Sequence, residues 1–232
     1  MIEKPAARPL PEAAGPSARG AADALPDVVM SWGRGWAVSR GVPSPVEVPG
    51  GFRADVGRPG HRVRYVLHTW DSGRLSALAR RVTAPGTWIK AAGRAAELRG
   101  ALPAGWTMDS SGHLMTARLT VGVADPPPPY RIRVALDCAV VVATVVDGDG
   151  GTAACGRMAP AGGCAIVDQV QTHPAHRRRG LGASVMRALS DHAARSGLGT
   201  GILVATDDGR RLYQTLGWTL RSEIAVAYVP QD

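Results

Sequence analysis

The chain has 232 residues, and 45% of them are hydrophobic, which is enough for one large core or two small ones. It contains no run of ~18 apolar residues that could span a bilayer, and its first residues lack the apolar stretch of a signal peptide. We therefore expect a cytoplasmic protein without a membrane partner.

The formal net charge of +8 raises the question of a nucleic-acid partner. Of the 27 basic residues, however, only Lys4 and Lys90 are lysines, which indicates a bias towards arginine across the whole chain. No long basic block with interleaved aromatic residues occurs, so the sequence predicts no nucleic-acid partner. A positive field would still attract an anionic small molecule.

The chain has three cysteines, Cys138, Cys155 and Cys164, without the Cys-x-x-Cys spacing of metal or redox sites. We expect them to be small, reduced residues of the core. The sequence therefore predicts no metal site.

Two segments divide the chain. Residues 1–27 are rich in Ala, Pro and Gly and show no sustained apolar period, so we expect a disordered or loosely attached arm. Residues 125–129 contain four consecutive prolines, which favour extended backbone and suit a linker. The expected folded parts are residues 28–124 and 130–232.

In the first part, β-branched or alternating apolar residues indicate strands, and apolar residues at helical spacing indicate helices. The predicted elements are a strand at Arg62–His68, a helix at Ser72–Val82, a strand at Thr87–Ala91, a helix at Ala92–Leu102 and a strand at His113–Leu119.

The second part begins with a predicted antiparallel meander and continues with alternating helices and strands. The meander strands are Ile132–Leu136, Ala139–Val146, Thr152–Met158 and Cys164–Thr172. They are followed by a helix from near Gly180 to Arg195, a strand at Gly201–Ala205, a helix at Asp208–Leu216 and a strand at Ile224–Val229.

The order of elements from Cys164 onward repeats that of the first part. The tetrapeptide Gly105-Trp106-Thr107-Met108 also parallels Gly217-Trp218-Thr219-Leu220 at the same place in that order. We infer an internal duplication. The alternative is one domain with a long N-terminal extension.

A phosphate-binding turn is predicted where the strand Cys164–Thr172 gives way to a helix, in the segment Arg177-Arg178-Arg179-Gly180-Leu181-Gly182-Ala183. The start of a helix offers unpaired amides and a positive dipole end, and glycine lets a phosphate approach them closely. Two nucleotide loops do not fit: position 185 is Val185 where a dinucleotide fingerprint needs glycine, and the Gly-Lys-Ser/Thr of a P-loop is absent.

Arg177-x-x-Gly180-x-Gly182, preceded by Pro174, resembles the Arg/Gln-x-x-Gly-x-Gly/Ala signature of the GNAT superfamily of acyl-CoA-dependent N-acetyltransferases. The segment Leu212–Trp218, Leu-Tyr-Gln-Thr-Leu-Gly-Trp, is similar to a second element of that family. The resemblance covers the chain from about Tyr130 onward. The first part carries no phosphate signature and would be a degenerate GNAT-like half.

The resemblance implies an α+β fold, with a mixed and mostly antiparallel sheet flanked by helices and two GNAT-like halves. It implies acetyl-CoA as cosubstrate, with its pyrophosphate on the backbone of the turn and its pantetheine arm along the preceding strand edge. The residues expected to bind it are Val170, Gln171, Thr172, Arg177, Arg178, Arg179, Gly180, Leu181, Gly182 and Ala183.

Acetyl transfer to an amine needs a neutral nucleophile, donors for the oxyanion and a proton for the leaving thiolate. Tyr213 matches the family tyrosine that supplies this proton, although a tyrosine packed with its hydroxyl bonded to backbone is the alternative. Asp168 is the candidate base, through water, because many family members carry a glutamate there; a structural aspartate is as compatible. Thr206 and Gly209 depart from the family's asparagine and alanine.

The expected function is acetylation of a primary amine on a small molecule or peptide. Acetylation of protein N-termini or lysines is the nearest alternative, and a catalytically idle acyl-CoA sensor is another. Four tryptophans of the first part, Trp32, Trp36, Trp70 and Trp88, could border the acceptor or belong to the core. The sequence gives no indication of the oligomeric state.

Overall fold

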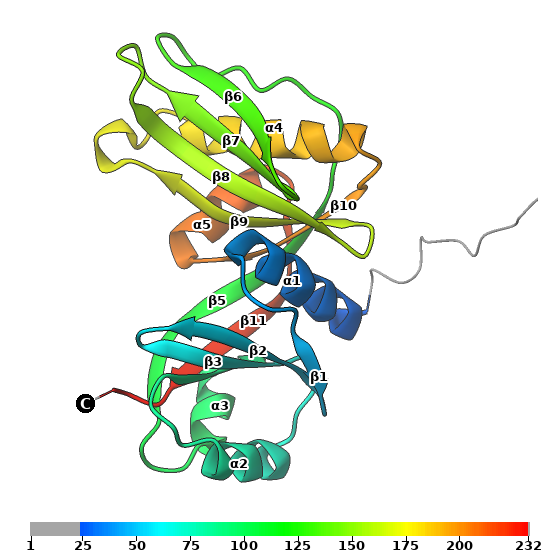
Figure 1. Cartoon of the computed structure of the whole chain (residues 1–232), viewed down its shortest axis with the longest axis vertical. Coiled ribbons are helices and arrows are strands. Elements are labelled where there is room, and N and C mark those ends of the chain that lie inside the picture. Colours follow the sequence, from blue (N-terminus) through cyan, green and yellow to red (C-terminus); the bar gives the residue numbers. More distant parts are fainter. Residues whose placement is uncertain (1–23, 232) are drawn as a thin grey trace, which may run out of the picture.

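The computed structural model describes residues 24–231, which form one continuous mixed sheet flanked by helices (Figure 1). The strand order is β1-β2-β3-β4-β11-β5-β10-β9-β8-β7-β6. The strands are β1 (Val46–Val48), β2 (Gly51–Arg58), β3 (His61–Leu67), β4 (Thr87–Ala92), β5 (Thr107–Arg118), β6 (Arg131–Asp137), β7 (Val140–Val146), β8 (Thr152–Ala161), β9 (Cys164–Thr172), β10 (Thr200–Ala205) and β11 (Thr219–Tyr228). The helices are α1 (Leu25–Arg40), α2 (Ser72–Arg81), α3 (Ala95–Ala101), α4 (Leu181–Arg195) and α5 (Asp207–Thr215), with a short 3-10 turn, η1 (Pro174–His176).

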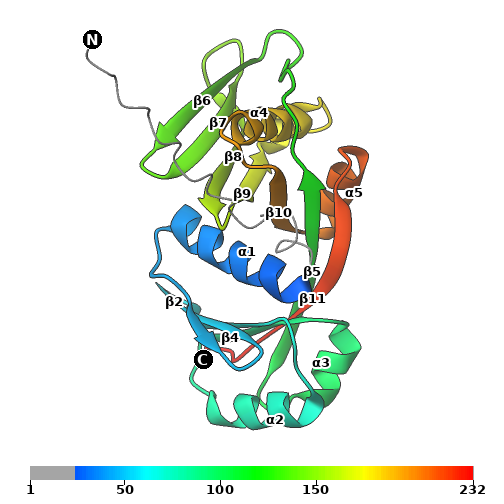
Figure 2. The ribbon, with the colours of Figure 1, turned by 90° about the vertical axis from the view of Figure 1, so that its right-hand side faces the viewer.

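Helix α1 crosses the middle of the molecule, between the part that carries α4 and α5 and the part that carries α2 and α3 (Figure 2). It contacts β8 and β9 with one side and β2 with another. Its glycines allow this close packing, because an added Cβ at Gly33 would meet the Phe52 ring and one at Gly35 would meet Ile166. The helix ends at Gly41, whose left-handed φ of 62° suits a residue without a side chain.

The order of elements repeats along the chain. The series β2-β3-α2-β4-α3-β5 corresponds to β8-β9-α4-β10-α5-β11, and in each series a helix connects two parallel neighbouring strands, β3 with β4 and β9 with β10. The corresponding strands stand in mirrored order across the sheet. The centre of this pattern lies between β11 and β5.

The last strand of each series pairs within the other series. Strand β11 lies between β4 and β5, and β5 lies between β11 and β10, all of them antiparallel. Both strands follow a glycine with positive φ, Gly105 at 91° and Gly217 at 82°, and then a buried tryptophan, Trp106 or Trp218. The matching tetrapeptides therefore occupy equivalent places, and the two series are interlocked.

Three apolar clusters fill the molecule. Two of them contain a residue from the strand that the other part of the chain contributes. One lies under α4 and α5 and includes Met115 from β5. Another lies under α1, and the third lies under α2 and α3 and includes Ala225 from β11. Strand β5 ends the first part of the chain and β11 ends the second, and each packs within the other part. The division of the chain at residues 125–129 therefore stays a prediction.

The helices and strands predicted from Arg62 onward are all present, with ends that differ by up to six residues, at the start of β5. No element was predicted between residues 28 and 61, where the structure has most of α1 together with β1 and β2. Of the predicted arm at residues 1–27, residues 1–23 lie outside the described part, and residues 25–27 are the first turn of α1. Cys138 is exposed at φ 53° in the β6–β7 turn, so its predicted place in the core is wrong; Cys164 is buried.

Among residues 24–231, no helix combines the length and the apolar character needed to cross a membrane.

We predict that Gly35→Ala lowers the free energy of unfolding by about 1 to 3 kcal/mol, because the new methyl group would lie 2.2 Å from Ile166 Cγ1 in a closed core. Urea unfolding measures the change. The matched control is Gly100→Ala on α3, where an added Cβ meets nothing within 4 Å, and this variant should gain about 0.4 to 1 kcal/mol. A Gly35→Ala protein as stable as the wild type would show that α1 is not packed this closely.

Candidate functional site

The two parallel strands β9 and β10 separate partway along their length. Their ladder joins Cys164 to Thr200 and continues only to the pair Ile166 and Ile202. Beyond this point β10 remains paired with β5, and β9 remains paired with β8. The facing edges of β9 and β10 therefore leave backbone groups without a strand partner, which is an edge that an extended ligand can join.

A bulge in β9 lies just past this separation. The register between β8 and β9 shifts between Cys155 and Arg157, where β9 has one more residue than β8. Gln169 sits in the bulge with φ 55°, an unusual value for a residue with a side chain. The bulge lies beside Asp168 and Val170, two of the predicted site residues.

The turn between η1 and α4 presents consecutive free amides. In residues 24–231, no acceptor binds the backbone N–H groups of residues 178–183, which we call the amide loop; the first helical bond is from Ser184 to Gly180. Arg178 and Gly180 both have left-handed φ, 62° and 77°, and the loop is exposed up to Gly180. Such alternation makes a concave array of donors, and the helix dipole adds positive potential.

The two glycines of this loop have different roles. Gly180 is needed for its positive φ, since an added Cβ there would meet nothing within 4 Å. Gly182 is needed for close packing, since its Cβ would lie 3.0 Å from Leu212 of α5. The amide loop is therefore both shaped by glycine and held against the helix that carries Tyr213.

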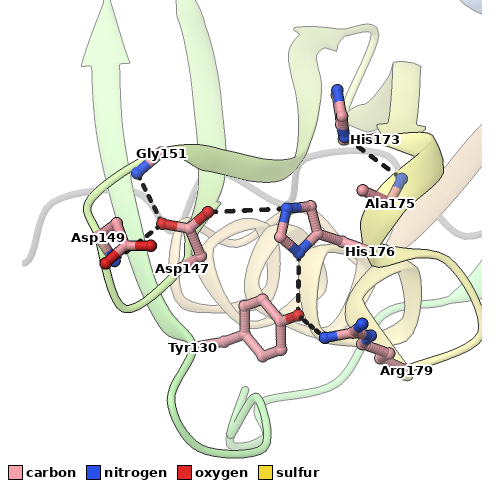
Figure 3. Close-up of polar contacts among 8 residues, drawn as sticks. All are labelled: Tyr130, Asp147, Asp149, Gly151, His173, Ala175, His176 and Arg179. Atoms are coloured by element: carbon pink, nitrogen blue, oxygen red, sulfur yellow. Dashed lines mark hydrogen bonds and ion pairs between the residues drawn. The ribbon is translucent and has the colours of Figure 1, made fainter.

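A polar network fixes one side of the amide loop (Figure 3). Arg179 Nη1 donates to the Tyr130 hydroxyl at 2.6 Å, and that hydroxyl lies 2.9 Å from His176 Nδ1. The other ring nitrogen of His176 lies 3.6 Å from Asp147, whose carboxylate also accepts the Gly151 amide. Arg179 is therefore turned towards Tyr130, and its guanidinium is engaged within the protein.

Tyr213 projects from α5 with a buried side chain, 8% exposed. Burial, and secondly the negative charge of Asp168, raise the pKa of Tyr213 to about 12. Among the described residues its hydroxyl makes no hydrogen bond, in contrast to a tyrosine held by backbone. The phenol thus stays protonated at neutral pH and has its proton available.

The two departures from the family pattern have local explanations. The Thr206 hydroxyl accepts the Gly209 amide at 3.2 Å and so caps the start of α5. At Gly209 an added Cβ would lie 3.1 Å from the Tyr213 ring. Both residues therefore serve the placement of Tyr213.

Asp168 lies on the opposite face of the sheet, under α1. Its carboxylate accepts two hydrogen bonds from Arg40, from Nε at 2.5 Å and from Nη2 at 3.0 Å. Gln169, with its amide oxygen turned towards α1, accepts Arg40 Nη1 at 2.9 Å. The predicted base thus forms a bidentate ion pair with Arg40, the last residue of a helix that the sequence did not predict.

Lys90, on β4, lies near Asp168 on this face. Burial, followed by the charges of Arg64 and Arg40, lowers the pKa of Lys90 to about 7, while Asp109 and Asp168 oppose the change. The sequence did not indicate this residue as part of a site. The available signal was its rarity, since lysine occurs only at Lys4 and Lys90 in an arginine-rich chain.

The structure therefore brings the predicted residues together around the separation of β9 and β10. The amide loop and Tyr213 lie on the face covered by α4 and α5, and Asp168 lies on the face covered by α1. The charge of Asp168 acts on Tyr213 as well as on Lys90. The predicted roles of these residues stay predictions.

Residues 144–226 match the family model of FR47-like proteins. A GCN5-related N-acetyltransferase from Kribbella flavida is 18% identical, with a TM-score of 0.64, over 95% of this chain and 98% of that one. Another from Sphaerobacter thermophilus is 14% identical, with a TM-score of 0.58, over 78% and 77%. A GNAT-family acetyltransferase from Novosphingobium aromaticivorans is 17% identical, with a TM-score of 0.53, over 89% and 99%.

No curated protein matches the chain. The matching family model and the likeness in fold confirm the resemblance to the GNAT superfamily and the predicted α+β fold. At these identities the solved structures show the fold alone.

We predict that stability increases with pH between about 7 and 9.5 because of Lys90. Its pKa is about 7 in the folded protein and 10.5 ordinarily, so in this interval the unfolded chain binds a proton that the folded chain does not, and folding is favoured as pH rises. The gain should be roughly 1 to 2 kcal/mol after allowance for solvent screening. Urea unfolding of wild type and Lys90→Met at several pH values measures it; equal pH profiles would contradict the prediction.

Proposed function

The chain has the fold of the GCN5-related N-acetyltransferases, with an FR47-like domain at residues 144–226, and on this premise we propose that it transfers an acetyl group from acetyl-CoA to a primary amine of a small molecule or peptide. The observation that carries the proposal is the run of free amides at residues 178–183 beside the separated edges of β9 and β10.

These residues suit an acyl-coenzyme A. The amide loop would hold the pyrophosphate, because six consecutive donors at a helix start match its oxygens and its charge. The β9 edge at Val170, Gln171 and Thr172, which β10 does not reach, would bind the amides of the pantetheine arm. Acetyl-CoA supplies a thioester that an amine can attack, with a thiolate as leaving group.

In the proposed reaction Tyr213 donates a proton to the leaving thiolate. It is protonated at neutral pH, it is buried, and its hydroxyl has no competing partner among the described residues. A phenol of pKa about 12 is by itself a weak donor to a thiolate of pKa ~8 to 9. Part of that rise comes from Asp168, so neutralising Asp168 would make Tyr213 a stronger acid.

Asp168 would be neutralised when it accepts, through water, the proton of the attacking amine. Its two oxygens are bound by Arg40, which positions the carboxylate at the opening of the sheet. The charge of Asp168 reaches Tyr213 from the face where the amine would approach. Loss of a proton by the amine and delivery of a proton to the thiolate are thereby coupled electrostatically.

We predict that Tyr213→Phe lowers kcat by about a hundredfold or more, because a general acid contributes roughly 10²- to 10⁴-fold, while the KM for acetyl-CoA changes less than about threefold. Release of coenzyme A with a panel of amines measures both constants. Tyr65→Phe on β3 is the control, since Tyr65 packs in the cluster under α2 and α3. Unchanged turnover of Tyr213→Phe would remove the tyrosine from the reaction, and silence of the wild type across the panel would favour an idle sensor.

We predict that Gly180→Val weakens acetyl-CoA binding by roughly thirtyfold or more, because a β-branched residue at φ 77° would distort the amide array. Arg178→Ala removes an exposed charge and keeps the amide, so it should weaken binding by only about fivefold or less. Calorimetric titration with acetyl-CoA compares the two. A larger loss for Arg178→Ala would mean that side-chain charge, and not backbone, holds the pyrophosphate.

A further inference from the structure

Two cationic side chains occupy neighbouring strands on the α1 face of the sheet. In the parallel ladder of β3 and β4, Arg64 stands opposite Trp88 and Val66 stands opposite Lys90. Because side chains alternate along a strand, Arg64 and Lys90 share the face on which Val66 packs into the cluster under α1. We call Arg64 and Lys90 the cationic pair.

Arg64 is buried, with 8% of its surface exposed, yet it has no carboxylate partner in residues 24–231. Its Nε donates to His61 Nε2 at 3.1 Å, and its guanidinium carbon lies 4.2 Å from the centre of the Trp36 ring. The two Nη groups make no hydrogen bond with the described residues, although they are not sealed from solvent. Burying a positive charge without a neighbouring anion costs free energy, so a bound anion would stabilise Arg64.

Lys90 likewise lacks an anionic partner among the described residues. Its ammonium has no hydrogen bond or ion pair with the described residues, and burial together with Arg64 lowers its pKa to about 7. For Arg64, burial and Arg40 lower the pKa to about 10. His61 adds no positive charge to the pair, because burial and the adjacent Arg64 lower the pKa of His61 to about 3 and keep it neutral. Both cations would be stabilised by a bound anion.

The anion can be assigned to the acceptor and not to coenzyme A. The amide loop and Tyr213 lie on the α4 and α5 face, whereas the cationic pair lies on the other face. The charge of Asp168, at the opening between the faces, acts on Tyr213, Arg64 and Lys90 alike. An acceptor placed beside the pair would therefore have its amine near the opening.

We propose that Arg64 and Lys90 bind a carboxylate of the acceptor, so that the substrate is an amine that carries a carboxylate, such as an amino acid or a short peptide. The free Nη groups of Arg64 suit the two oxygens of a carboxylate, which guanidinium binds in a bidentate manner. Stacked rings of His61, Trp88 and Tyr228 border the pair, with centroids 4.6 and 4.7 Å apart. This inference rests on the proposed acyltransferase function.

The direct test compares the proteinogenic L-amino acids with their α-carboxamides as acceptors, with coenzyme A release as readout. The inference expects kcat/KM for the free acid to exceed that of its amide by about tenfold or more, the value of a charge-assisted pair. Equal use of acid and amide, or preference for an amine phosphate such as O-phosphoethanolamine, would overturn the carboxylate assignment while leaving the acyltransferase proposal intact.

Two variants test the residues. Arg64→Gln and Lys90→Gln should each raise the KM for the free acid by about tenfold and change kcat/KM for the amide by less than about threefold. Arg62→Gln, an exposed position on the same strand, is the matched control and should match the wild type. Thermal unfolding checks that the variants fold, and we expect no loss of Tm, since each change removes a positive charge that has no anionic partner among the described residues. Equal loss on acid and amide would refute the assigned role.

If no amine of either series is acetylated, calorimetry with the N-acetyl amino acids, the products of the expected reaction, tests the pair without turnover. Binding that is lost in Arg64→Gln and kept in Arg62→Gln supports the inference even when the proposed activity fails. Absence of binding to the wild type, with coenzyme A present as the other product, contradicts it.

Discussion

Hydrogen bonding between β9 and β10 stops at Ile166, and every part of the proposed site depends on this interruption. Backbone amides and carbonyls without partners are expensive when buried, so a sheet that opens in its middle needs water or a ligand to satisfy them. The bulge at Gln169 turns β9 away, and the amide loop begins where the strand ends. The opening thus connects the amide loop on one face with Asp168 on the other.

The interlocked halves build one side of this opening. Strand β10 is paired over its whole length with β5, which comes from the first part of the chain. His113 of β5 also bonds Asp207 of α5 at 2.6 Å, and this bond is the main cause that lowers the pKa of Asp207. The first part of the chain therefore contributes strand β5 to the wall of the proposed site and, through α1, brings Arg40 to Asp168. A half without a phosphate signature can still be essential for the other half.

The features that sequence reasoning could predict are encoded locally. Gly180, Gly182 and the Leu212–Trp218 segment lie where strand, turn and helix signals follow each other closely. The turn before α4 and the position of Tyr213 on α5 therefore follow from the order of residues. The matching glycine–tryptophan segments likewise indicated the repeat, because both begin a strand after a helix.

The features that it missed depend on contacts between distant residues. Helix α1 contains Gly33 and Gly35, which lower its helix propensity, and these glycines are explained only by the close approach of Phe52 and Ile166 from distant strands. The ion pair between Arg40 and Asp168 joins residues 128 positions apart. The neighbourhood of Arg64 and Lys90 depends on the register of β3 with β4. None of these contacts has a local signal.

A crystal structure of the protein with acetyl-CoA tests the central claim most directly. The diphosphate should lie against the backbone amides of residues 178–183, and the pantetheine arm should lie between β9 and β10 beyond Ile166, with the thioester between Tyr213 and Asp168. A cofactor whose diphosphate is bound elsewhere, for example by Arg64 and Lys90, and whose pantetheine arm does not lie between β9 and β10, would contradict the account.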